Sequence, residues 1–315
     1  MELMKSTRQF CWRAGLGIAL LAFILWRADI AGLSAVLTPA VWPAALLALA
    51  LLVSSQGLAA LRWGLILGQP RPAWAVLFRL YLMGAGAGLF LPTSVGGDAF
   101  RAAAAARLTG RPAATISSVL LDRMSGVVAL LVYAATGWLA APTTAERLIG
   151  GASWSGPPPL LLLALGALLG AGLIGIIARS RVERVRRIRQ EVVDGVRPLL
   201  RQPARLAAVL GLALLVQALM LLLWLVLATG LALPIPAETL LVGVPIVSLA
   251  TLLPLTIAGL GVREGVWLFL LRASGINATA IVSFSLLYFF VTLLAGALGG
   301  LVFVRWGVGD RRLGG

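Results

Sequence analysis

Six apolar runs along the chain are long enough to cross the hydrocarbon core of a membrane as helices. Such a helix needs about 20 apolar residues, because each residue advances it by about 1.5 Å. The runs are residues 11–27, 41–66, 113–140, 157–178, 206–232 and 276–304. This pattern predicts an all-α integral membrane protein with six transmembrane helices. We expect the first run to be a retained anchor, because Trp26, Arg27 and Asp29 stand where a signal peptide has small cleavage-site residues.

Two further apolar segments, residues 74–108 and 238–272, are interrupted in the middle by proline and glycine. Proline removes a backbone donor and glycine weakens a helix, so each segment is expected to break there. The residues of the two breaks are Pro92, Gly96 and Gly97 in the first segment, and Pro254, Gly259 and Gly261 in the second. After each break only about 11 helical residues remain, over 98–108 and 262–272, which cover about half a bilayer. We therefore expect two re-entrant helical hairpins.

The composition agrees with a membrane protein. Of the 315 residues 60% are hydrophobic and 12% are charged, whereas a soluble domain is about 45–50% apolar and about 25% charged. These figures exclude a soluble enzyme. The net charge of +15 would suggest nucleic acid as the partner of a soluble protein, but here the positions of the arginines relative to the membrane account for it. No nucleic-acid partner is expected.

The basic residues also predict the orientation in the membrane. Residues 179–205 contain nine arginines, and such loops face the cytoplasm. We expect this segment to form an amphipathic helix on the membrane surface. Working outward from it places both termini in the cytoplasm, the first hairpin on the cytoplasmic side and the second on the outer side. The predicted location is the inner (plasma) membrane of a bacterium.

The chain contains a weak internal repeat. Pro92, Gly97 and Arg101 are followed 162 positions later by Pro254, Gly259 and Arg263. The helices that precede the hairpins share glutamine and tryptophan at an offset of 161, as Gln56 and Trp63 against Gln217 and Trp224. The topology inverts the second copy relative to the first, an arrangement typical of secondary transporters. We expect one polytopic domain over residues 1–315, with repeat 1 at about 41–140 and repeat 2 at about 206–304.

Ionisable side chains within the predicted membrane segments are the candidate functional groups, because they are costly there. They are Asp98, Arg101, Asp122, Arg123, Arg263 and Glu264, with Arg62 and Arg79 nearer the cytoplasmic surface. Arg101 and Arg263 follow the breaks by about one helical turn. Helix N-termini and guanidinium groups both bind phosphate, so the pattern predicts one anion site facing each leaflet. The acids Asp98, Asp122 and Glu264 are candidates for proton coupling.

A structural interpretation of the same charges stays open. Asp98 and Arg101 are three residues apart and share a helix face, and each acid could neutralise a neighbouring arginine in a static ion pair. The chain contains no histidine and a single cysteine, Cys11, which removes the commonest general base and metal ligands. We expect no metal, no cofactor and no enzymatic activity, although an aspartate-based membrane transferase stays an alternative.

Three motifs resemble a known family. They run from Leu91 to Arg101, from Ser118 to Arg123 and from Pro254 to Gly265, and they are similar to the transmembrane region of lysylphosphatidylglycerol synthases. The family is also described as flippase-like and includes the multiple peptide resistance factor. The resemblance implies functional roles for Pro92, Gly96, Gly97, Asp98, Arg101, Asp122, Arg123, Gly259, Gly261, Arg263 and Glu264. The chain ends about ten residues after its last predicted span, so the cytosolic synthase domain and lipid aminoacylation are not expected here.

Together these features predict a lipid translocase that moves a phosphate-bearing headgroup between leaflets. Its partners would be membrane lipids: an anionic or zwitterionic phospholipid, a polyprenyl phosphate or a hopanoid-type lipid. A homo-oligomer is compatible with the sequence. The alternatives are a permease for a small anionic solute, and an accessory subunit or transferase of lipid or glycan synthesis.

Overall fold

A computed structural model describes residues 39–68, 71–90, 96–150, 201–252, 259–272 and 274–306, together with residues 197 and 199. All regular structure within these ranges is helical. The elements are a short 3₁₀ helix (Pro39–Val41), α3 (Trp42–Leu67), α4 (Trp74–Phe90), α5 (Gly96–Thr109), α6 (Pro112–Ala140), α7 (Pro142–Gly150), α10 (Pro203–Gly230), α11 (Ala237–Leu252), α12 (Val262–Leu271) and α13 (Ala278–Trp306).

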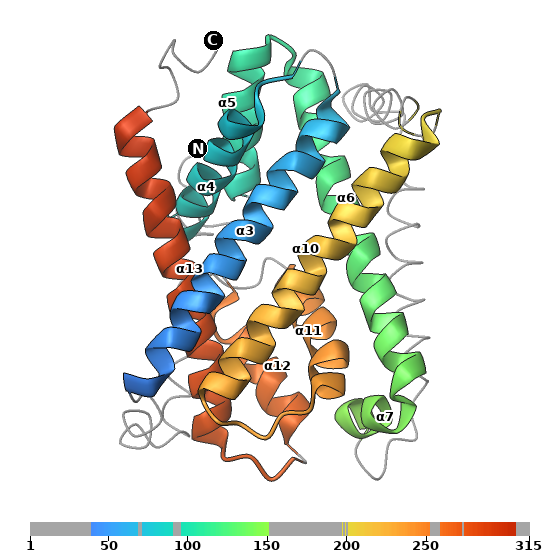
Figure 1. Cartoon of the computed structure of the whole chain (residues 1–315), viewed down its shortest axis with the longest axis vertical. Coiled ribbons are helices and arrows are strands. Elements are labelled where there is room, and N and C mark those ends of the chain that lie inside the picture. Colours follow the sequence, from blue (N-terminus) through green and yellow to red (C-terminus); the bar gives the residue numbers. More distant parts are fainter. Residues whose placement is uncertain are drawn as a thin grey trace, which may run out of the picture.

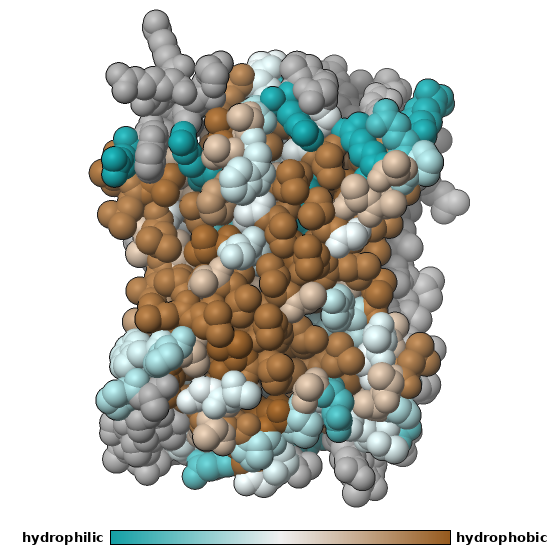
Figure 2. Space-filling view, viewed as in Figure 1, coloured by the Kyte–Doolittle hydropathy of each residue, from teal (hydrophilic) through white to brown (hydrophobic). Residues whose placement is uncertain are grey.

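Four helices, α3, α6, α10 and α13, are long and apolar enough to cross a membrane. They confirm four of the six predicted spans as helices, to within about three residues at each end. The predicted spans 11–27 and 157–178 lie outside the described residues, as does most of the segment 179–205, whose last three residues belong to α10. Figure 2 shows a broad apolar band across the face in view, with hydrophilic residues gathered toward its two ends.

Prolines mark where three of the four long helices begin. A proline occupies the first turn of α3, α6 and α10, where its missing N–H has no intrahelical acceptor to lose. At the other end of α3, Gly68 adopts a φ of 72°, a left-handed conformation that glycine allows without steric cost. Proline or glycine therefore marks several ends of the long helices in the sequence, and the length of each apolar run predicts the length of its helix.

Each of the two broken segments forms two shorter helices. The first contains α4 and α5, and the second contains α11 and α12. Pro92 and Pro254 lie outside the described residues. In Figure 1 α4 and α5 occupy the upper half of the molecule, whereas α11 and α12 occupy the lower half. The helices α3 to α6 have 26, 17, 14 and 29 residues, and α10 to α13 have 28, 16, 10 and 29 residues. The order long, short, short, long therefore occurs twice.

The helices α4 and α5 touch through their backbones. A Cβ atom added to Gly84 would lie 2.9 Å from the carbonyl oxygen of Gly97, and one added to Gly97 would overlap the carbonyl oxygen of Gly84. Neither position can hold a side chain without separating the two helices. This close approach brings α5, and the charged residues on it, against α4.

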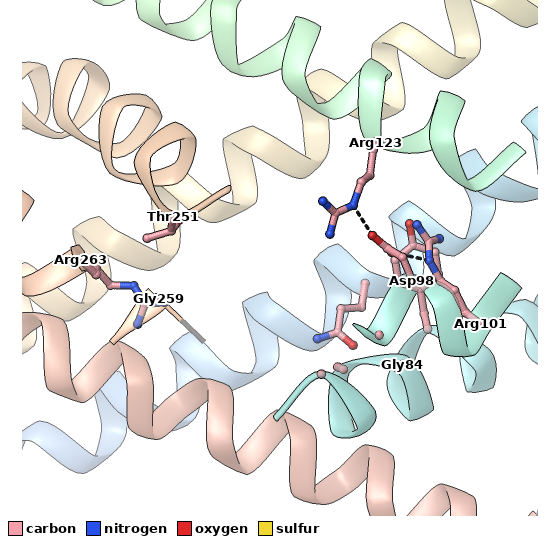
Figure 3. Close-up of a pocket in the computed structure, with 12 residues that line it drawn as sticks. Gly84, Asp98, Arg101, Arg123, Thr251, Gly259 and Arg263 are labelled. Carbon is pink, nitrogen blue, oxygen red and sulfur yellow. Dashed lines mark hydrogen bonds and ion pairs between the residues drawn. The ribbon is translucent and has the colours of Figure 1, made fainter. Parts of the chain in front are cut away.

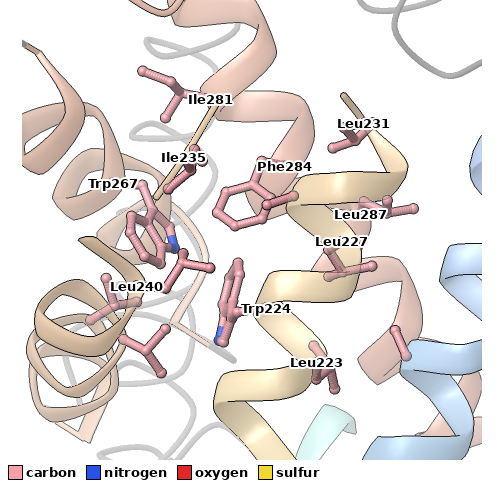
Figure 4. Close-up of a cluster of buried hydrophobic side chains, with 14 of the residues drawn as sticks. Leu223, Trp224, Leu227, Leu231, Ile235, Leu240, Trp267, Ile281, Phe284 and Leu287 are labelled. Atoms are coloured by element: carbon pink, nitrogen blue, oxygen red, sulfur yellow. The ribbon is translucent and has the colours of Figure 1, made fainter. Parts of the chain in front are cut away.

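The two larger apolar clusters centre on different sets of helices, one on α3 to α6 and the other on α10 to α13. One surrounds Trp63 of α3 with residues of α4, α5 and α6. The other surrounds Trp224 of α10 with Trp267 of α12 and Phe284 of α13, which meet at their ring edges or at tilted angles (Figure 4). The two halves also interlock. The helix α4 packs on α13, where a Cβ atom on Gly86 would lie 2.8 Å from the carbonyl oxygen of Gly296, and α11 packs on α6, where a Cβ atom on Gly137 would lie 3.1 Å from the carbonyl oxygen of Leu241.

Candidate functional site

A cavity of about 400 Å³ lies between the two pairs of short helices. Its lining comes from α3, α4, α5, α6 and α11, and from residues at and before the start of α12. The lining residues are Gln56, Tyr81, Gly84, Ala85, Gly88, Gly97, Asp98, Arg101, Arg123, Thr251, Gly259 and Arg263. In Figure 3 Asp98, Arg101 and Arg123 face this space from one side, and Thr251, Gly259 and Arg263 face it from the other.

Arg101 is held on several sides at once. Its Nε donates to Asp98 Oδ1 at 2.8 Å, and its Nη2 donates to Asp122 Oδ2 at 3.0 Å. The flat guanidinium lies 4.2 Å from the ring centre of Tyr81 and 5.0 Å from that of Trp63. Only 3% of the residue is exposed. A buried arginine keeps its charge, so these partners hold a fixed positive charge beside the cavity.

Asp122 of α6 forms hydrogen bonds with side chains of three other helices. It is 1% exposed, and its Oδ1 accepts a hydrogen bond of 2.7 Å from Nε of Arg62 on α3. Its Oδ2 accepts from Arg101 and from the hydroxyl of Tyr81 on α4. A buried carboxylate needs such partners, because an unpaired charge in low dielectric is very costly. Asp122 therefore ties α3, α4 and α5 to α6.

Asp98 completes the network at the cavity wall. Its Oδ1 pairs with Arg101 and its Oδ2 pairs with Arg123 of α6. The side chain of Arg123 is 31% exposed, whereas that of Arg101 is 3% exposed. The charges thus form one continuous chain in the order Arg62, Asp122, Arg101, Asp98 and Arg123.

Two glycines shape the opposite wall, at the start of α12. Gly259 and Gly261 have φ values of 72° and 80°, which suit glycine and strain other residues. A Cβ atom on Gly259 would lie 3.4 Å from Nη2 of Arg263, so the missing side chain leaves room for the guanidinium. Arg263 itself is 8% exposed and lies 4.7 Å from the ring centre of Tyr288 on α13.

Glu264 has a local role beside Arg263. One of its oxygens accepts a hydrogen bond of 2.6 Å from the backbone N–H of Gly261, and the other accepts one of 2.7 Å from the hydroxyl of Ser285. The first bond caps the start of α12. This fully buried carboxylate therefore fixes the turn from which Arg263 projects and joins α12 to α13.

The structure brings together residues that the sequence placed in two separate sites. Arg101 and Arg263 were expected to form one anion site facing each leaflet, but both line the same cavity. The i, i+3 pair of Asp98 and Arg101 is present. The neighbours Asp122 and Arg123 do not follow the simple pairing, since Asp122 pairs with Arg62 and Arg101 while Arg123 pairs with Asp98. Successive residues on a helix point in different directions, which explains the exchange.

The remaining predicted residues are near the cavity without lining it. Asp122 and Glu264 lie behind the arginines, Gly96 begins α5 and Gly261 precedes α12. Sequence reasoning missed the lining residue Tyr81 and the second partner of Asp122, Arg62, which was expected nearer the cytoplasmic surface. An arginine inside an apolar run is a signal that could have found Arg62. No group of three potential metal ligands occurs in the described part of the chain.

These features define a multi-pass helical membrane protein with a charged cavity between two pairs of broken helices. The chain belongs to the family of the lysylphosphatidylglycerol synthase TM region, which it matches over residues 12–300. No curated protein and no solved structure matches the chain. The family relates the protein to membrane-lipid biology.

Proposed function

We propose that this protein is a lipid translocase of the bacterial inner membrane, which moves a phosphate-bearing headgroup between the two leaflets without altering it chemically. The observation that carries the proposal is the cavity lined by Arg101, Arg123 and Arg263. Its volume of about 400 Å³ falls within the range of about 300–1,000 Å³ that small-molecule sites occupy. A headgroup fits such a space while the acyl chains stay outside.

The charges on the wall suit phosphate better than other ligands. Three guanidinium groups face the space and one carboxylate, Asp98, faces it with them. Guanidinium groups form paired, charge-assisted hydrogen bonds to phosphate oxygens. Ionisable residues within a membrane protein usually mark the path of a substrate. The membrane family to which the chain belongs supports a lipid as that substrate.

The arrangement of helices supports alternating access by an inverted repeat. The order of long and short helices recurs in the two halves, and the short helices of the two halves lie toward opposite ends of the molecule (Figure 1). In this proposal each pair of short helices is a re-entrant hairpin, α4–α5 entering from the cytoplasm and α11–α12 from outside. Rocking of one repeat against the other then opens the shared cavity to each leaflet in turn.

A labelling experiment tests this topology. Single cysteines replace Arg107, exposed near the end of α5, and Glu238, exposed at the start of α11, in a chain carrying Cys11→Ser. An impermeant maleimide should label Arg107→Cys only from the cytoplasmic side and Glu238→Cys only from the outer side. Labelling of both positions from the same side contradicts the inverted repeat.

Asp98 is the proposed coupling residue. It pairs with both Arg101 and Arg123, so a phosphate that engages Arg123 competes with its carboxylate. In this proposal transport is coupled to protons through Asp98, and its carboxylate is ionised while the headgroup is bound. A pH gradient across proteoliposomes should change the translocation rate of the native protein and leave that of Asp98→Asn unchanged.

The function itself is tested by lipid movement in proteoliposomes. Tail-labelled fluorescent phospholipid reports transfer between leaflets, since dithionite quenches only the outer one. Arg123→Gln and Arg263→Gln should each slow transfer about tenfold or more, the factor expected when one charged hydrogen bond is lost. The matched controls are Arg107→Gln on α5 and Arg272→Gln at the end of α12, both of which are exposed.

Two results would overturn the proposal. If Arg123→Gln and Arg263→Gln translocate as fast as the native protein, the cavity does not bind the headgroup. If a soluble phosphate ester enters the vesicles while no lipid moves, the protein is a solute permease that uses the same arginines. Mass spectrometry of the vesicle lipids after the assay should show them chemically unchanged, and a modified lipid would point to a transferase.

A further inference from the structure

The carboxylates beside the cavity already have hydrogen-bond partners on both oxygens. Asp98 accepts from Arg101 and Arg123, and Asp122 accepts from Arg62, Arg101 and Tyr81. A headgroup that carries an ammonium ion needs an anionic acceptor when it leaves water. To supply one, the network would have to release an arginine into low dielectric. These contacts therefore disfavour a headgroup with an amine.

The third carboxylate, that of Glu264, also has a hydrogen-bond partner on each oxygen. Glu264 accepts from the N–H of Gly261 and from the hydroxyl of Ser285, one bond to each oxygen. Within the described part of the chain, the acids in and beside the cavity wall therefore all have partners. Asp98 and Asp122 bind arginines, and Glu264 binds the start of α12 and Ser285 of α13. The free energy of binding an ammonium group would have to compensate for breaking one of these bonds.

The balance of charge favours a monoanion. The lining holds three arginines against one aspartate. The pair of Arg62 and Asp122 behind it adds no net charge, and Glu264, next to Arg263 in the chain, removes one positive charge. Four guanidinium groups thus face three carboxylates, which leaves an excess of one positive charge. A phosphodiester neutralises this excess, whereas a phosphomonoester carries about −1.5 to −2 at neutral pH.

Two buried polar groups next to the cavity suit hydroxyl groups. The side-chain oxygen of Gln56 is buried and has no hydrogen-bond partner among the described residues, and neither does Nη1 of Arg101. Both residues line the cavity. A hydroxyl donates to an amide oxygen and accepts from an N–H, so it satisfies Gln56 in either orientation of its amide. Leaving such a group without a partner is costly.

From these contacts we infer that the headgroup is a polyol phosphodiester, with one negative charge, free hydroxyl groups and no ammonium group. This inference rests on the proposed function and adds the chemical class of the substrate. The phosphodiester lies between Arg123 and Arg263, and the polyol reaches the amide of Gln56. Phosphatidylglycerol and phosphatidylinositol are lipids of this class.

A headgroup series in proteoliposomes tests each part of the inference. Four tail-labelled lipids are compared: phosphatidylglycerol, phosphatidylmethanol, phosphatidylethanolamine and phosphatidic acid. Phosphatidylglycerol should move fastest. Phosphatidylmethanol, which keeps the charge and lacks the hydroxyls, should be about tenfold slower, the factor that one unsatisfied polar group costs. Phosphatidylethanolamine and phosphatidic acid should be slower than phosphatidylglycerol by at least the same factor.

Substitution of Gln56 tests the hydroxyl contact. In Gln56→Leu the ratio of the phosphatidylglycerol rate to the phosphatidylmethanol rate should fall to about one. The matched control is Gln217→Leu in α10, because Gln217 bonds weakly to the carbonyl of Gly126 at 3.5 Å and is not among the lining residues. It should keep the native preference.

Soluble headgroups give a second measurement that does not depend on lipid movement. Glycerophosphoglycerol should raise the unfolding temperature of the detergent-solubilised protein at about tenfold lower concentration than glycerophosphoethanolamine. Equal or reversed preference in both measurements overturns the inference and leaves the proposed function standing. If no lipid moves faster than in protein-free vesicles, the proposed function fails, and the headgroup preference is decided by the soluble series.

Discussion

The two pairs of short helices use different means to hold an arginine beside the same cavity. In the first, Arg101 of α5 is paired with Asp98 and Asp122 and lies over the ring of Tyr81. In the second, Arg263 of α12 lies over the ring of Tyr288. Asp122 and Tyr288 are each the eleventh residue of a helix of 29 residues, α6 and α13. Corresponding helices thus contribute a carboxylate in one half and an aromatic ring in the other.

The two arginines are therefore expected to behave differently beside the cavity. The first arginine belongs to a network that joins α3, α4, α5 and α6, so moving it would disturb four helices at once. We therefore expect the α4–α5 half to provide the rigid wall of the cavity, while the ring of Tyr288 attracts Arg263 by about 0.5–2 kcal/mol.

Removal of Asp122 should have the largest effect on stability. Asp122→Ala leaves Arg62 and Arg101 buried without their shared carboxylate, which should lower the free energy of unfolding by about 3–5 kcal/mol. Denaturant titration in detergent measures the change. The control is Glu238→Ala, an exposed acid at the start of α11, which should change it by less than about 0.5 kcal/mol. A loss below about 1 kcal/mol for Asp122→Ala would show that the network does not hold the first half together.

The same substitution at the two tyrosines should give different results. Tyr81→Phe removes the hydroxyl that donates to Asp122, and the loss of a hydrogen bond to a charged group should cost about 1.5–3 kcal/mol. Tyr288→Phe keeps the ring under Arg263 and its stacking on Trp224, so it should cost less than about 0.5 kcal/mol. Equal losses in the same titration would mean that the two arginines are held alike.

The smallest expected effects come from two glycine-to-alanine substitutions, one where the new Cβ meets backbone and one where it meets no atom. Gly97→Ala must push α5 away from α4, because the new Cβ overlaps the carbonyl oxygen of Gly84, and should cost about 1–3 kcal/mol. Gly265→Ala in α12 meets nothing within 4 Å and should stabilise the helix by up to about 1 kcal/mol. Thermal unfolding of the two variants in one detergent measures the contrast. If Gly97→Ala is as stable as Gly265→Ala, the contact of α4 with α5 is not tight.

Much of the fold could be predicted from the sequence because local physical rules determine it. Apolar length predicted α3, α6, α10 and α13, and the Pro and Gly residues predicted where the short helices are interrupted. The helix after the first break was expected over 98–108 and is found at Gly96–Thr109, and the one after the second was expected over 262–272 and is found at Val262–Leu271. The re-entrant and inverted arrangement stays a prediction that the cysteine labelling tests.

The partners of the charged residues could not be predicted in the same way. Spacing identified the pair of Asp98 and Arg101, because residues three apart on a helix face the same side. It could not show that Asp122 reaches Arg62 across the interface of α3 and α6, since that contact depends on how the helices cross. Nor could it place Tyr81 and Gln56 on the wall of a cavity.

By itself, the sequence predicted the four long apolar helices, the two interrupted segments and the charges that follow each interruption. These are local properties, set by hydrophobicity, by the missing N–H of proline and by the freedom of glycine. Only the tertiary structure decided that Arg101 and Arg263, 162 residues apart, line one cavity and that Asp98 bridges Arg101 and Arg123. The physical reason is that packing between helices selects partners from every charged residue that reaches the interface, and spacing along the chain constrains only those on the same helix.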